Sequence, residues 1–176
     1  MSQIHPVQFL LDDHRVIEDV LNAFENRIEK LPESPLKPTW MGDALAFFRN
    51  FVEGCHHSRE EALLFPYLRV AGLLEEHECG ARFVEGLEAH LAAARQGDMV
   101  ATRALRREGL AYVEFVRKHI RKEDALLHEV ARQPATRAEI SRLYEEADPE
   151  QFHEMDQDTY ESYLALADSL CSARAA

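Results

Sequence analysis

The sequence is poor in several features that mark common classes of protein. Its 176 residues include only seven glycines and seven prolines, and the charged residues are mixed with leucine and alanine, which favours helix over sheet. No apolar run approaches the roughly 18 residues that a membrane-spanning helix needs. The first residues, MSQIHPVQ, lack the basic and apolar stretches of a signal peptide. We therefore expect a helical protein that does not associate with a membrane.

Cysteine and positive charge are also scarce. The three cysteines form no Cys-x-x-Cys pair, which argues against a disulfide framework or a cysteine zinc site and predicts a reducing, cytoplasmic location. Lysine and arginine number 20 against 32 aspartates and glutamates, which gives a net charge of −12. Because so acidic a protein repels phosphate groups, we expect no nucleic acid and no anionic membrane surface as a partner.

A helical pattern of apolar residues runs through most of the chain. Apolar residues recur three and four positions apart in four segments, which are separated by breaks that contain proline or glycine. The segments are residues 7–31, 39–66, 73–95 and 99–132, and Asp98 is a candidate N-cap of the last one. The pattern predicts an all-α fold, an up-down-up-down four-helix bundle over residues 1–133.

The last part of the chain, residues 134–176, differs in composition. It carries ten acidic and three basic residues. We expect one or two short helices there, the last near residues 159–171, as an acidic extension that packs on the bundle. Its candidate contact residues are Leu143, Tyr144, Tyr160, Tyr163, Leu164, Leu166 and Leu170.

The sequence also repeats itself at an offset of 63 residues. Residues 10–14 (LLDDH) match residues 73–77 (LLEEH), and residues 56–64 (HHSREEALL) match residues 119–127 (HIRKEDALL). A helical hairpin that is used twice predicts a bundle with a pseudo-two-fold axis. Two copies of one half-site then face each other across that axis.

The repeat places histidine and glutamate on the apolar faces. Each face carries one histidine, and two of these histidines are followed by a glutamate four residues later on the same face. The six candidate ligands are His14, His56, Glu60, His77, His119 and Glu123. The neighbouring pair His57 and Glu61 has the same spacing but is turned roughly 100° away, given 3.6 residues per turn. The apolar pattern therefore selects His56 and Glu60 as the core pair.

Two carboxylates in a helical core need a partner of opposite charge. No lysine or arginine lies on the four apolar faces, and an unpaired buried carboxylate is very costly. Two metal ions, about 3.5–4 Å apart as in other dinuclear sites, would neutralise both. Imidazole and carboxylate ligands together suit iron, zinc or manganese.

With these residues the chain resembles the hemerythrin family, in its bacterial hemerythrin-like (HHE cation-binding) branch, over roughly residues 5–131. The strings HHSREEALLFP and HIRKEDALL are close to the signatures of that branch. The resemblance implies two non-haem iron ions, oxo- or hydroxo-bridged, with Glu60 and Glu123 shared between them and zinc or manganese as substitutes. The terminal ligands would be divided in pairs, His14 with His56 and His77 with His119.

The sequence departs from the oxygen-carrying hemerythrins, which have two histidines spaced by four on the third helix. On either side of His77 stand Leu73 and Ala81, so the fifth histidine is missing. Asp124 is an alternative to Glu123 as the bridging acid. Candidates for additional ligation are Glu18, His57 and Glu61.

The resemblance implies a choice of functions. Roles in the family include oxygen carriage, sensing of oxygen, nitric oxide or iron, and repair of iron–sulfur clusters. The first hypothesis is a module that binds or senses O2, NO or iron at the dinuclear site. The alternatives are a di-iron oxidoreductase that acts on peroxide, and a metal-stabilised structural bundle that docks a protein partner through its acidic extension. Whether the protein is an enzyme stays open, because binding and catalysis both need open metal positions.

Overall fold

The computed structural model describes residues 6–65, 71–146 and 157–173, and in these residues it contains helices and no strand. The elements are α1 (Pro6–Ile28), α2 (Pro38–Phe47), η1 (Phe48–His56), α3 (His57–Leu63), α4 (Ala71–Ala94), α5 (Met99–Ala131), α6 (Pro134–Glu146) and α7 (Gln157–Ser172). Here η1 is a π-helical segment, whereas the others are α-helices. The prediction of an all-α fold is confirmed.

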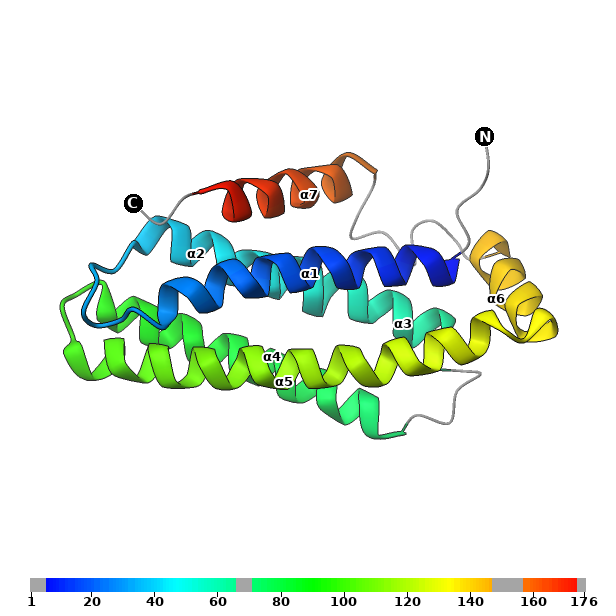
Figure 1. Cartoon of the computed structure of the whole chain (residues 1–176), viewed down its shortest axis with the longest axis horizontal. Helices are drawn as coiled ribbons and strands as arrows, with labels where there is room; N and C mark the ends of the chain where they lie inside the picture. Colours follow the sequence, from blue (N-terminus) through cyan, green and yellow to red (C-terminus); the bar gives the residue numbers. More distant parts are fainter. Residues whose placement is uncertain (1–5, 66–70, 147–156, 174–176) are drawn as a thin grey trace.

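The long helices lie side by side along the longest axis of the molecule (Figure 1). The α1 helix runs in one direction, the continuous stretch α2–η1–α3 returns, and α4 and α5 repeat the same course. The Asp98 side chain accepts hydrogen bonds from the backbone N–H groups of Val100 and Ala101, which confirms it as the N-cap of α5. None of the described helices is both long and apolar enough to cross a bilayer.

Two apolar clusters fill the bundle at different heights. The larger one contains the aromatic residues Phe24, Phe47, Phe48, Phe51 and Tyr112, all fully buried. The smaller one lies where α1 begins and α5 ends, and it includes Val7, Leu10, Leu127 and Val130. On α1 His14 lies between these clusters and on α5 Glu123 does, whereas His119 directly precedes Ile120 of the larger cluster. Apolar side chains therefore enclose the polar site on both sides along the bundle axis.

The two C-terminal helices pack on the bundle. Figure 1 shows α7 along one side, next to α1 and α2, and α6 across the end where α1 begins. Leu170 is buried in the larger cluster, and the other predicted contact residues with described side chains, Tyr160, Tyr163, Leu164 and Leu166, pack against it. These predicted contacts are confirmed, whereas the side chains of Leu143 and Tyr144 lie outside the described residues. The division of the chain at residue 133 stays a prediction.

The segment 39–66 is not the regular α-helix that the pattern predicted. Its middle part, η1, is π-helical, and the backbone N–H of His57 donates to the carbonyl oxygen of Val52, five residues earlier. A π-turn holds more residues than an α-turn, so the side chains that follow it rotate relative to those before it. This change of phase matters for the site described next.

Candidate metal centre

The six predicted ligands come together in the core. They are contributed by α1, η1, α3, α4 and α5, and none is more than 5% exposed. We call His14 and His56 the first histidine pair, and His77 and His119 the second histidine pair. Glu60 and Glu123 lie between the two pairs.

The carboxylate of Glu60 faces both histidine pairs. Its Oε1 atom is 3.5 Å from Nε2 of His14 and 3.5 Å from Nε2 of His56. Its Oε2 atom is 3.7 Å from Nε2 of His77. Each oxygen of this fully buried glutamate is thus directed to a different pair.

Glu123 repeats this arrangement from the opposite helix. Its Oε2 atom is 3.5 Å from Nε2 of His14. Its Oε1 atom is 2.9 Å from Nε2 of His119 and 3.4 Å from Nε2 of His77. Both glutamates therefore divide their oxygens between the two pairs, which is the arrangement that two bridging carboxylates need.

The outer nitrogen of each histidine also has a carboxylate partner. The Nδ1 distances are 2.7 Å for His14 to Asp124, 3.3 Å for His56 to Asp13, 2.8 Å for His77 to Glu61 and 2.9 Å for His119 to Glu76. Because a carboxylate only accepts hydrogen bonds, Nδ1 donates, and in the neutral ring the central Nε2 then keeps its lone pair. Carboxylate partners of this kind orient metal-binding histidines.

These outer carboxylates recur at the offset of the internal repeat. Asp13 and Glu76 are 63 residues apart, and so are Glu61 and Asp124. Glu61 and Asp124 are candidate ligands by sequence, but in the structure they lie on the outer side of His77 and His14. Asp13 and Glu76 have no role in the sequence-based prediction, although both stand within the repeated strings. Glu18 faces Arg117 instead, with 3.3 Å between its Oε2 and the arginine Nε.

Six central atoms of the site are buried without a hydrogen-bond partner. They are Nε2 of His14, His56 and His119, both carboxylate oxygens of Glu60, and Oε2 of Glu123. An unpaired buried polar group costs about 1–3 kcal/mol, and none of the described lysines or arginines forms an ion pair with either glutamate. Every one of these atoms can donate a lone pair to a cation, so the donor set fits a metal centre.

The protonation states in the metal-free protein also favour a cation at this site. Burial by itself would lower the pKa of His14, but the contacts with Asp124, Glu123 and Glu60 raise it to about 11. Burial would likewise raise the pKa of Glu123, but the adjacent imidazoles of His119, His14 and His77 hold that pKa well below its usual value. In the metal-free protein a protonated His14 thus faces an ionised Glu123, whereas burial raises the pKa of Glu60. Metal cations can take the place of such protons.

His57 does not lie where the sequence analysis placed it. It was expected to be turned away from the core, but only 6% of it is exposed. Its ring stacks on that of His77, with 3.7 Å between the centroids, and its Nδ1 is 3.1 Å from Oε2 of Glu53. The expectation is wrong because it assumed 3.6 residues per turn, whereas the π-helical turns of η1 bring two consecutive histidines into the core.

Two overlapping groups of buried side chains can each hold an ion. Within each group, one ligand atom per residue lies within 4.8 Å of all the others. The first group is His14, His56, Glu60 and Glu123, and the second is His57, Glu60, His77 and His119. Glu60 belongs to both groups.

The C-terminal helix also contributes to the surroundings of the site. The carboxylate of Asp13 is fully buried and accepts hydrogen bonds from Tyr160 Oη at 2.7 Å and from Arg59 at 3.2 Å, besides its contact with His56. Tyr160 belongs to α7 and is 147 residues away from Asp13 in the sequence. No sequence pattern connects these two positions, so only the structure could reveal the contact.

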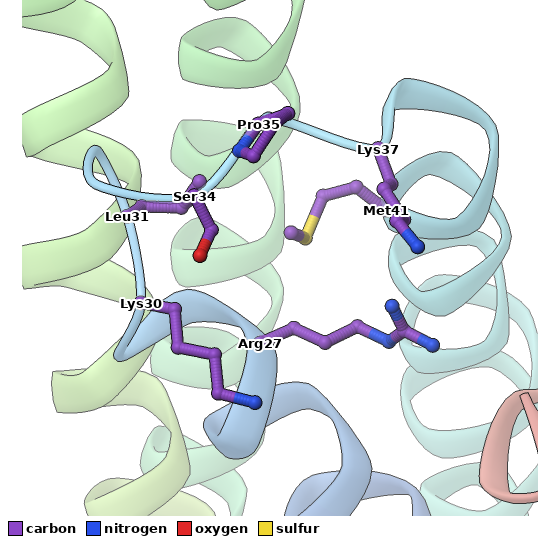
Figure 2. Close-up of a pocket in the computed structure, with 7 residues that line it drawn as sticks. All are labelled: Arg27, Lys30, Leu31, Ser34, Pro35, Lys37 and Met41. Atoms are coloured by element: carbon purple, nitrogen blue, oxygen red, sulfur yellow. The ribbon is translucent and has the colours of Figure 1, made fainter. Parts of the chain in front are cut away.

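Two cavities differ in their relation to the site. One, of about 330 Å³, lies between α1 and α5, and its lining includes His14 and its partner Asp124. The other, of about 350 Å³, lies where α1 ends and α2 begins (Figure 2). Its lining includes Arg27, Lys30 and Lys37 but no histidine or carboxylate, so it does not offer metal ligands. Of these two cavities, the first adjoins the site, because His14 is part of its lining.

Comparisons with known proteins agree with the geometry. A family model described as "Hemerythrin HHE cation binding domain" matches residues 5–131. Similar curated proteins are an uncharacterized protein of Mycobacterium bovis and one from each of two strains of Mycobacterium tuberculosis. Each is 23% identical over 164 residues, and the match covers 88% of this chain and 64% of the relative. The chain thus spans less than two thirds of the length of these relatives. No solved structure gives a significant match.

Proposed function

The chain belongs to the family of hemerythrin HHE cation-binding domains, and from this premise we propose that its core holds two iron ions that bind or sense a small molecule such as O2 or NO. His14 and His56 would hold one ion, and His77 and His119 the other. Glu60 and Glu123 would be shared. Zinc or manganese would fit the same donors.

One observation carries this proposal. Glu60 and Glu123 each direct one oxygen to the first histidine pair and the other oxygen to the second pair. A mononuclear site would need all of its donors to converge on one point. Two carboxylates with divided oxygens instead support two ions side by side, each with imidazoles on its outer side.

The protein's own residues would set the conditions at such a centre. A bound iron pair supplies redox activity and open positions for a small ligand. The carboxylates Asp13, Glu61, Glu76 and Asp124 keep the four imidazoles turned toward the ions. The two apolar clusters exclude bulk water along the bundle axis, and the cavity beside His14 leaves a lateral approach. The three free cysteines fit a reducing compartment such as the cytoplasm.

The proposal is tested on the purified chain after anaerobic reconstitution with Fe²⁺. We expect two iron ions per chain and a visible absorption band that develops on exposure to O2 or NO and is reversed when the gas is removed. A spectrum that bleaches while added peroxide is consumed would indicate the oxidoreductase instead. A chain that takes up no iron from an iron-replete medium would contradict both functions and leave a zinc-stabilised or metal-free bundle.

A further prediction concerns the contact between α7 and the site. Tyr160→Phe removes the hydroxyl that donates to Asp13, which loosens the support of His56. We expect the affinity for iron to fall about tenfold, the lower end of the range for outer partners of metal-binding histidines. The measurement is an anaerobic iron titration against a competing chelator.

The matched control for this variant is Tyr163→Phe. Tyr163 also packs on the core from α7, but the hydroxyl that donates to Asp13 is that of Tyr160. Removing the hydroxyl of Tyr163 should leave the iron affinity unchanged. If both variants weakened iron binding equally, the effect would come from the packing of α7 and not from the hydrogen bond to Asp13.

A further inference from the structure

The cavity where α1 ends and α2 begins gathers positive charge, and we call it the cationic cavity. It measures about 350 Å³, and its lining includes Arg27, Lys30 and Lys37, whereas none of the described residues in the lining is acidic. Figure 2 shows Arg27 and Lys30 coming from the end of α1 and the turn after it, and Lys37 from the start of α2. The whole chain has a net charge of −12. Three basic side chains around one cavity therefore oppose the charge of the molecule as a whole.

Contacts with uncharged groups hold Arg27 in this lining. One of its N–H groups donates to the carbonyl oxygen of Ala173 at 2.5 Å, and its guanidinium lies over the ring of Trp40, 4.2 Å from the ring centroid. Arginine has five N–H donors, so others remain for a ligand. Burial lowers the pKa of Arg27, whereas hydrogen bonds with glutamates raise the pKa of Arg49 and of Arg117. The contacts of Arg27 thus fix its guanidinium in place without supplying an opposite charge.

The rest of the lining combines a hydroxyl group with apolar surface. Ser34 contributes the hydroxyl, which can donate or accept a hydrogen bond. Leu31 and Met41, each 2% exposed, form the apolar part together with Pro35. The volume lies within the roughly 300–1,000 Å³ of small-molecule sites. The cavity therefore has room for a charged group that carries a small organic body.

The charge of the lining favours one class of ligand. Against three basic side chains, a carboxylate group of charge −1 offers less compensation than a group of charge −2. A phosphate monoester carries about −1.5 to −2 at neutral pH and has three strong acceptor oxygens. Guanidinium, ammonium and hydroxyl groups are common donors to such oxygens in proteins. A phosphate group thus matches both the charge and the donors of the cationic cavity.

We infer that the cationic cavity binds a small, soluble phosphate monoester. The three basic side chains surround the phosphate, and the apolar part of the lining packs against the organic body. The site is separate from the metal centre, because Arg27 follows His14 by 13 residues in α1, about 20 Å at 1.5 Å per residue. The inference therefore does not depend on the proposed iron ions.

The test measures the binding of phenyl phosphate to the purified full chain by isothermal titration calorimetry, in a buffer without phosphate. We expect one molecule to bind per chain. Benzoate, which presents a carboxylate on the same ring, should bind at least about tenfold more weakly, because it has half the charge and fewer acceptor oxygens.

Two variants remove positive charge from the cavity. Lys30→Gln and Lys37→Gln should each weaken the binding of phenyl phosphate about tenfold, the loss expected for one hydrogen bond to a charged group. The control is Lys118→Gln, which removes the same charge from an exposed position of α5 outside the cavity and should leave the affinity unchanged. Lys30 and Lys37 are also exposed, so all three variants should keep the unfolding midpoint of the unaltered chain.

Two further measurements locate the bound molecule and its source. In ¹H–¹⁵N NMR spectra, phenyl phosphate should shift backbone amide signals within residues 27–41 and not those around His14. Vesicles that contain phosphatidic acid should not bind, because the inferred ligand is a soluble ester and not a lipid headgroup. The inference is overturned if phenyl phosphate does not bind, if benzoate binds as tightly, or if the two cavity variants keep full affinity. Shifts centred on His14, or binding to the vesicles alone, would overturn it as well.

Discussion

Replacing Glu60 with alanine should release both metal ions, not one. Each oxygen of this carboxylate faces a different histidine pair, so neither ion keeps its full set of donors when the side chain is removed. We expect the affinity for both ions to fall by more than about 100-fold, beyond the roughly 10–100-fold that outer partners cost. Glu123→Ala should have the same effect. Metal analysis after equilibration with limiting iron measures the loss.

The adjacent Glu61 provides the matched control. Among the described residues it pairs with the outer Nδ1 of His77, and its side chain is 41% exposed. Glu61→Ala should therefore weaken binding moderately and keep two ions at saturating iron. The double variant of Glu60 and Glu123 should lose little more than either single variant, because residues that act as one unit are not additive. Single variants that each lost one ion and kept the other at full affinity would show two separate mononuclear sites.

Removal of the metal should lower the thermal stability strongly without unfolding the chain. An ion present at a thousand times its dissociation constant adds about 4 kcal/mol to the free energy of unfolding. At roughly 2–4 °C per kcal/mol for a chain of this size, two ions should raise the unfolding midpoint by about 15–30 °C. Differential scanning calorimetry of the chelator-treated and reconstituted protein measures this difference.

The metal-free chain should stay folded, because the two apolar clusters pack without the site. The buried aromatic residues of the larger cluster, among them Phe24 and Phe48 in an edge-to-face contact at 5.3 Å, do not depend on the ions. The double variant Glu60→Ala/Glu123→Ala is the control, and iron should not raise its midpoint. A metal-free chain without a cooperative transition would contradict this expectation.

The outer carboxylates show how far the repeat could be followed. Asp13 and Glu76 stand beside His14 and His77 in the repeated strings, so their equivalence was visible in the sequence. Their partners were not visible, because Asp13 contacts His56 and Glu76 contacts His119, each on a different helix. An offset between two segments says which positions are equivalent, but it does not say which side chains meet across the bundle.

By itself, the sequence determined the all-α fold, the helical segments and the six residues that converge on the core. These follow from local periodicity and from the repeat, since an apolar face with one histidine on each helix has only one way to be buried. The tertiary structure decided the burial of His57 and the contact of Tyr160 with Asp13. The first depends on a π-helical hydrogen-bond pattern that changes the phase of the helix, and the periodicity analysis assumed a constant phase. The second depends on how α7 docks against α1, and this docking joins residues whose separation of 147 positions leaves no trace in any local pattern.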